Sequence, residues 1–288
     1  MKFGVCNEIF QNWKFDDILS CAARIGYDGV ELAPFTLART VSEISSAQRG
    51  QIRGSAARHG LEICGLHWLL AKTEGLHLSA PDAAVRARTS KYLAECVDCC
   101  ADLGGKVLVL GSPQQRNIPA GSSPEDAWQL AATTLRDVVK RAEDRAVVLC
   151  IEPLSPVETN FINSAAEAID FAGLFHSPAA KIILDVKAMC SEQIPIPDII
   201  YKSWPHFAHF HANDSNLGGP GSGSVDYTPI AAALLSVGFS AYVSVEVFRY
   251  EEGSENIATR SLEYLRSKFP SVARSEIKRH NNRGATAS

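Results

Sequence analysis

The stretch VVLCIEPLSPVETNFINSAAEAIDFAGLFHSPAAKIILD, residues 147–185, contains a strand, a loop, a helix and a second strand. The apolar runs at 147–152 and 181–185 are typical of buried strands in a parallel sheet. Between them, Ser164 and Glu167 have the spacing of a capping box, which predicts a helix over residues 168–175. The stretch therefore predicts a strand–helix–strand unit with parallel strands.

The same alternation extends along the whole 288-residue chain. We predict eight strands, at residues 3–6, 29–32, 62–67, 106–110, 147–152, 181–185, 207–211 and 242–247. From Val5 to Val245 they recur about every 34 residues, the length of a strand, a crossover helix and two loops. Eight such α/β units favour closure into a (β/α)8 barrel, the TIM barrel, over an open sheet.

We expect residues 1–270 to form this barrel as a single domain, because no internal linker interrupts the pattern. Residues 271–288 have few apolar side chains and several positive charges. They are expected to be a disordered C-terminal tail, with a contact arm in an oligomer as the alternative.

Composition and charge exclude several classes of protein. Hydrophobic residues make up 46% of the chain and charged residues 21%, which excludes a disordered or fibrous chain. The net charge of −4 argues against nucleic-acid binding. No apolar stretch approaches the roughly 18 residues of a membrane span, and Glu8 and Lys14 interrupt the region where a signal peptide would be apolar. We therefore expect a cytoplasmic protein with neither a nucleic-acid nor a membrane partner.

The eight cysteines lie in apolar runs or at helical positions. In a cytosolic chain of this size, free buried thiols are expected rather than disulfides. Cys96 and Cys99 have the spacing of half a zinc site, but no second pair follows. With Cys100 they have helical periodicity, so we interpret them as the buried side of a helix.

Ionisable side chains mark the last four predicted strands near their C-terminal ends. In chain order these positions hold Glu152, Asp185, a histidine that is either His209 or His211, and Glu246. Since those ends of barrel strands converge on one face, three carboxylates and one imidazole are expected around a common point. The carboxylates would repel one another unless a cation lay between them. We predict that the four residues bind one divalent metal ion, Mn²⁺ first, with Mg²⁺, Co²⁺ or Zn²⁺ as alternatives.

Three segments carry a family resemblance: residues 151–160, IEPLSPVETN; residues 184–189, LDVKAM; and residues 209–223, HFHANDSNLGGPGSG. They resemble the sugar phosphate isomerase/epimerase superfamily, whose members are xylose-isomerase-like TIM barrels. Within it, the chain is most similar to ketose 3-epimerases of the tagatose/psicose type, in which Glu, Asp, His and Glu hold a divalent metal. The resemblance assigns these roles to Glu152, Asp185, His211 and Glu246, and it implies that Glu158 contacts substrate hydroxyls.

The chain departs from those epimerases at two positions. Ala188 stands where they have a substrate-contacting His, and Leu217 stands near where they have an Arg. Lys187 either replaces part of that polarity or pairs with a neighbouring carboxylate. The glycine-rich residues 218–223 leave three interpretations open: close backbone approach to a ligand, phosphate binding, or an ordinary mobile loop.

The predicted site indicates proton-transfer chemistry. A metal ion bound to adjacent carbonyl and hydroxyl oxygens of a sugar acts as a Lewis acid and favours removal of the α-proton to a cis-enediolate. If Glu152 and Glu246 flank opposite faces of the reacting carbon, one removes the proton and the other returns one to the far face. Besides Glu158, the predicted substrate-binding residues are His67, Trp68, Arg116, Lys187 and Asn213.

We therefore expect a metal-dependent isomerase or epimerase acting on a sugar, a sugar phosphate or an oxidised sugar, working as a homo-oligomer, either dimer or tetramer. A lyase or dehydratase resembling inosose dehydratases is the alternative, because the same enediolate can expel a leaving group. More distant are an enzyme resembling endonuclease IV, whose three-zinc cluster lacks ligands in this chain, and a noncatalytic sugar-binding module.

Overall fold

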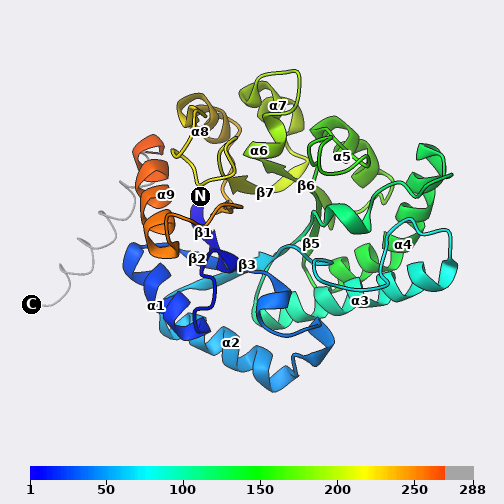
Figure 1. Ribbon diagram of the computed structural model, residues 1–288, viewed down its shortest axis with the longest axis horizontal. Coiled ribbons are helices and arrows are strands. Elements are labelled where there is room, and N and C mark those ends of the chain that lie inside the picture. The colour runs from blue at the N-terminus through cyan, green and yellow to red at the C-terminus, as the bar shows by residue number, and fades with distance from the viewer. Residues whose placement is uncertain (270–288) are drawn as a thin grey trace, which may run out of the picture.

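The structure is a computed structural model, and it describes residues 1–269. Within these residues, eight parallel strands pair in chain order and close into a barrel, which confirms the predicted fold (Figure 1). The strands are β1 Lys2–Cys6, β2 Gly29–Leu32, β3 Glu62–Leu66, β4 Val107–Leu110, β5 Val148–Ile151, β6 Ala180–Asp185, β7 Phe207–Ala212 and β8 Tyr242–Val245. The barrel closes where β1 pairs with β8, with Val5 opposite Val245. The predicted strand ends differ from these by one or two residues.

Helices follow the strands and form the outer ring seen in Figure 1. They are α1 Phe15–Ile25, α2 Ser46–Arg58, α3 Ala83–Leu103, α4 Pro124–Asp144, α5 Ala165–Gly173, α6 Val186–Met189, α7 Ile196–Ser203, α8 Tyr227–Ser236 and α9 Ser254–Lys268. The Ser164 side chain accepts a hydrogen bond from the Glu167 N–H, so α5 begins directly after Ser164 and three residues earlier than predicted. None of the helices in the described part of the chain is long and apolar enough to cross a membrane.

The main apolar core lies between the strands and the helices, whereas much of the barrel interior is polar. A small apolar cluster of Val107, Val109, Cys150 and Ile183 is separate from the main core. Elsewhere, ionisable side chains of strands that are not neighbours meet: Glu31 of β2 contacts His209 of β7. Buried ionisable groups from several strands thus meet inside the barrel.

The cysteines are free thiols, and all except Cys190 are buried. Cys96, Cys99 and Cys100 lie on the buried side of α3, as predicted. The predicted domain end at residue 270 and the predicted disordered tail fall on residues outside the described part of the chain.

Candidate metal centre

The four predicted metal ligands come together at the C-terminal end of the barrel. Glu152 follows β5, Asp185 ends β6, His211 lies in β7 and Glu246 follows β8. Each of them offers one ligand atom, and these atoms all lie within 4.8 Å of one another. All four side chains are buried, with at most 6% of Glu152 exposed. Three carboxylates and an imidazole therefore lie close together and are largely shielded from solvent.

The protonation of His211 follows from its two neighbours. Its Nε2 lies 3.1 Å from Oε1 of Glu31, a carboxylate that can only accept, so we assign the ring proton to Nε2. When the ring is neutral, this leaves a lone pair on Nδ1, which lies 3.1 Å from Oε2 of Glu246 and 3.9 Å from Oε1 of Glu152. Burial opposes protonation of the ring, but the charges of Glu246 and Glu31 raise the pKa of His211 well above its ordinary value, so without an ion Nδ1 carries a proton. Within residues 1–269, neither Nδ1 of His211 nor Oε2 of Glu246 has a hydrogen-bond partner. Two buried acceptors that face each other fit a shared cation.

Asp185 is held in place by two donors. Its Oδ1 accepts from the Ala188 N–H at 2.7 Å, and its Oδ2 accepts from Nδ2 of Asn213 at 2.5 Å. The Oδ1 of Asn213 in turn accepts from the Lys187 N–H at 2.7 Å. Asn213 is fully buried and lies outside the lining of the cleft described below, so the structure places this predicted substrate contact in support of Asp185 instead.

Burial and charge give the carboxylates different proton affinities. Burial, followed by repulsion from Glu246, raises the pKa of Glu152 to about 8. Burial also opposes ionisation of Glu246, but the positive charge of a protonated His211, whose Nδ1 lies 3.1 Å from Oε2 of Glu246, outweighs it and lowers the pKa of Glu246 to about 2. Burial raises the pKa of Asp185 as well. Near neutral pH the cluster therefore retains a proton that a metal ion would displace.

A cleft of about 470 Å³ opens above the four residues, and both Glu152 and Glu246 line it. Trp68, two residues after β3, forms one wall, and its Nε1–H donates to Oε1 of Glu246 at 2.7 Å. The backbone of Trp68 has φ of +52°, an uncommon conformation for an aromatic residue, of the kind that concentrates at functional sites. Its ring is stacked against Phe248 with centroids 6.0 Å apart.

Another part of the cleft lining is charged. Lys187 and Glu158 both line it, and their Nζ and Oε1 atoms lie 2.7 Å apart. The Nζ of Lys187 also lies 4.0 Å from the centre of the Phe248 ring. Of the two interpretations of Lys187, the structure supports the ion pair, and it places that pair where a ligand would meet it.

Two other residues that were predicted to bind substrate do not line the cleft. Arg116 is only 1% exposed, and its guanidinium donates to the carbonyl oxygens of Leu110 and Ile162, so it supports the backbone beneath the cleft. His67 is fully buried in the barrel, with its Nε2 2.8 Å from Oε2 of Glu8. Neither side chain is part of the cleft lining. Both differ from prediction because the sequence places a residue on a loop or strand but does not fix the direction of its side chain.

Comparison with known proteins assigns this barrel to a family. A family model described as a xylose isomerase-like TIM barrel matches residues 19–268. The chain belongs to this family. It is similar to D-psicose 3-epimerase of Agrobacterium fabrum, with 28% identity over 255 residues that cover 86% of this chain and 85% of that protein. It is also similar to fructoselysine 3-epimerase of Shigella flexneri, with 21% identity over 278 residues, 94% of this chain and 99% of that protein.

Solved structures agree on the fold. The structure of D-psicose 3-epimerase with D-tagatose from Clostridium cellulolyticum H10 superposes with a TM-score of 0.82 at 21% identity, covering 93% of this chain and 99% of that one. The predicted resemblance to ketose 3-epimerases is therefore confirmed at low identity, and these sugar epimerases confirm the prediction that the chain is an isomerase-class enzyme.

Two buried acids of this xylose isomerase-like barrel were not among the predicted site residues. Glu31, in β2, accepts from Nε2 of both His209 and His211, at 2.7 and 3.1 Å. The charges of the two histidines outweigh burial and keep the pKa of Glu31 well below its ordinary value. Glu8, just after β1, pairs with His67. The available signal was a Glu within or beside a short apolar strand, where charge is otherwise absent.

Glu31 is expected to position the imidazole of His211, a candidate metal ligand. Replacing it with glutamine leaves one buried histidine N–H facing an amide NH₂ and removes the charge that fixes the His211 ring. We expect Glu31→Gln to weaken Mn²⁺ binding by about 10–100-fold, measured by isothermal titration calorimetry. Glu62→Gln, at an exposed position of the next strand, is the matched control. Equal Mn²⁺ affinity of the two variants would contradict this role for Glu31.

Metal binding by the xylose isomerase-like barrel is expected to depend on pH. Because the pKa of Glu152 is raised to about 8, a metal ion that binds at pH 6–7 must displace the proton of Glu152. Above pH 8, Glu152 has already lost this proton. Mn²⁺ affinity should therefore rise with pH below pH 8, by about tenfold per pH unit for the Glu152 proton, and the raised pKa of His211 adds to this dependence. Calorimetry of the EDTA-treated protein in buffers of different ionisation enthalpy measures the released proton directly. A pH-independent affinity would be inconsistent with the raised pKa.

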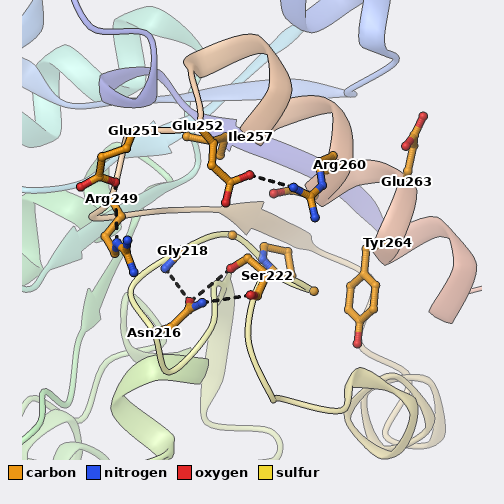
Figure 2. Close-up of a pocket in the computed structure, with 14 residues that line it drawn as sticks. Asn216, Gly218, Ser222, Arg249, Glu251, Glu252, Ile257, Arg260, Glu263 and Tyr264 are labelled. Atoms are coloured by element: carbon orange, nitrogen blue, oxygen red, sulfur yellow. Dashed lines mark hydrogen bonds and ion pairs between the residues drawn. The ribbon is translucent and has the colours of Figure 1, made fainter.

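The glycine-rich loop at residues 218–223 borders a separate hollow of about 280 Å³ (Figure 2). Its backbone is bonded internally: the Gly218 N–H donates to Oδ1 of Asn216 at 2.9 Å and the Gly223 N–H to Oδ2 of Asp214 at 3.1 Å. Across the hollow, Arg260 pairs with Glu252 at 2.8 Å. These donors are already used within the protein, which does not support the phosphate-binding interpretation of the loop.

Proposed function

We propose that this protein is a metal-dependent sugar isomerase or epimerase that transfers a proton through a cis-enediolate. The observation that carries the proposal is the pair of buried acids, Glu152 and Glu246, that line one cleft and share a candidate metal centre with Asp185 and His211. A pair of acids is what removal of a proton from one face and its return to the other requires. A divalent ion, Mn²⁺ in this proposal, would be held by these four residues and would stabilise negative charge on adjacent sugar oxygens.

Glu246 and Glu152 have different hydrogen-bond environments, as expected if one removes a proton and the other returns one. The Trp68 N–H fixes one oxygen of Glu246, so this carboxylate meets a sugar in one orientation. Glu152 lies in the same cleft and follows β5 rather than β8. In the proposed reaction one of them takes the proton from the carbon next to the carbonyl, and the other delivers a proton to the opposite face. The aromatic walls exclude water, which limits competing exchange of the proton.

Substrate hydroxyls are proposed to contact the charged pair at the cleft wall. Glu158 is held by Lys187 and by the Ser155 hydroxyl, which donates to its Oε2 at 2.9 Å. A carboxylate fixed by two donors still has lone pairs for substrate hydroxyls. Trp68, in the same lining, offers a flat apolar face to the sugar ring.

Family membership does not select the substrate, since the relatives are named for D-psicose and for fructoselysine. We propose a carbohydrate with a free keto group, because both names denote sugars of that kind. We further propose a cytoplasmic location, in keeping with the free thiols, and, as a separate proposal, assembly as a homo-oligomer.

Solvent-deuterium incorporation into a panel of keto-sugars, followed by NMR with Mn²⁺ present, tests the proposal. Deuterium should enter at the carbon next to the carbonyl, with inversion or migration of the carbonyl in the correct substrate. Loss of water from the sugar would instead favour a dehydratase. Absence of exchange with every sugar and every divalent metal would favour a noncatalytic sugar-binding module and overturn the proposal.

A further inference from the structure

A second hollow lies directly beside the catalytic cleft. We call it the side cavity; its volume is about 650 Å³, and Trp68 and Lys72 line both it and the cleft. The rest of its lining comes from the segment after β1, from the segment after β2 that includes the short helix η2 Pro34–Thr36, and from Tyr250 after β8. A molecule bound in the cleft can therefore extend past Trp68 and Lys72 into this space.

Aromatic rings dominate the walls of the side cavity. Phe10, Trp13, Phe35 and Tyr250 line it together with Trp68. Trp13 is 39% exposed and makes an edge contact with Phe10, with ring centroids 5.5 Å apart. Aromatic faces of this kind suit molecules that combine apolar C–H surfaces with polar edges, as sugar rings do.

A buried acceptor also lies in this lining. Glu8 is 7% exposed, and its Oε2 is taken by His67. Its Oε1 is buried and has no hydrogen-bond partner among residues 1–269. Buried carboxylate oxygens are nearly always hydrogen-bonded, but Oε1 is closed to solvent here, so a hydroxyl in the side cavity reaches it only after the Glu8 side chain turns.

The charges of the side cavity balance. Glu8 supplies one negative charge and Lys72 one positive charge, and the other lining residues are uncharged. An anionic or cationic substituent would therefore gain no net attraction. The cleft alone, at about 470 Å³, already has the size of a small-molecule site, so a single sugar would leave the side cavity unused.

We propose that the side cavity binds a second, uncharged sugar ring, so that the substrate is a keto-sugar linked to another sugar rather than a free monosaccharide. This rests on the proposed function, because it assigns the first ring to the metal-centred cleft. The second ring packs against the exposed face of Trp13, and it donates a hydroxyl to Glu8 once that side chain has turned toward the side cavity.

The test compares D-fructose, D-fructose 6-phosphate and two ketose disaccharides, isomaltulose and lactulose, in the Mn²⁺-dependent deuterium-exchange assay. At least one disaccharide is expected to exceed D-fructose in kcat/KM by tenfold or more. Faster exchange of D-fructose or its phosphate than of both disaccharides would overturn the proposal.

Trp13→Ala should lower the ratio of kcat/KM between disaccharide and D-fructose by about tenfold. Trp204→Ala is the matched control, because Trp204 is 40% exposed and makes an equivalent edge contact with Phe207, with centroids 5.6 Å apart. An unchanged ratio in Trp13→Ala would contradict the role of the side cavity.

Calorimetric binding to the Mn²⁺-loaded protein separates this proposal from the proposed function. In one outcome no sugar undergoes exchange, but a disaccharide binds at least tenfold more tightly than D-fructose and Trp13→Ala removes that preference. This outcome would contradict the proposed function and support sugar binding in the side cavity. If D-fructose binds as tightly as the disaccharides, the side cavity fails whatever the exchange assay shows.

Discussion

Replacing Glu246 with glutamine is expected to abolish deuterium exchange, lowering its rate by about 10³-fold, within the range for loss of a positioned general acid or base. Glutamine has the shape of glutamate, and its amide oxygen can still accept from Nε1 of Trp68, so the cleft should keep its form. The variant loses the proton acceptor and one anionic ligand facing Nδ1 of His211. The measurement is exchange under saturating Mn²⁺, which separates lost chemistry from weakened metal binding.

Glu251→Gln is the control for this experiment. Glu251 lies five residues farther along the chain, is exposed and pairs with Arg249 at 3.6 Å. The same chemical change there should leave exchange within about twofold of the unmodified protein. Full activity in Glu246→Gln would remove Glu246 from its proposed role.

Gly111→Ala is expected to displace the Glu152 carboxylate and so weaken the metal centre. Gly111 directly follows β4, and a Cβ atom built on it would overlap Oε2 and Cδ of Glu152. The obstacle is the end of a flexible side chain, so the fold should survive while the carboxylate moves. We expect Mn²⁺ affinity to fall by about 10–100-fold, the range found when the orientation of a ligand is disturbed.

Gly173→Ala serves as the matched control, since Gly173 ends α5 and a Cβ there meets open space. Calorimetry gives the Mn²⁺ affinity of both variants, and thermal unfolding in EDTA shows whether each retains its stability. Similar Mn²⁺ affinities in the two alanine variants would mean that Glu152 does not need the space beside Gly111.

The barrel was predictable because its signals are local. Apolar runs such as residues 181–185 and caps such as Ser164 each specify one element, and chain connectivity orders the strands around the barrel. The clustering of the four predicted ligands was predictable for the same reason, since the ends of parallel strands must meet at one face. The comparisons support the family that three segments of sequence had already suggested.

The contacts that could not be predicted from the sequence are those that depend on side-chain direction and on pairing across the barrel. Arg116 turns inward to backbone carbonyl groups instead of lining the cleft. Glu31 reaches His211 from a strand that is not its neighbour, and nothing in local sequence spacing indicates that contact. The need for glycine at position 111 also could not be predicted, because it comes from the Glu152 carboxylate, which occupies the place of a Cβ atom there.

Anomalous scattering from crystals grown with Mn²⁺ tests most directly whether Glu152, Asp185, His211 and Glu246 hold one metal ion. A single strong peak is expected between these four side chains at the C-terminal end of the barrel. A peak elsewhere, or no peak between them, would contradict the proposed metal centre.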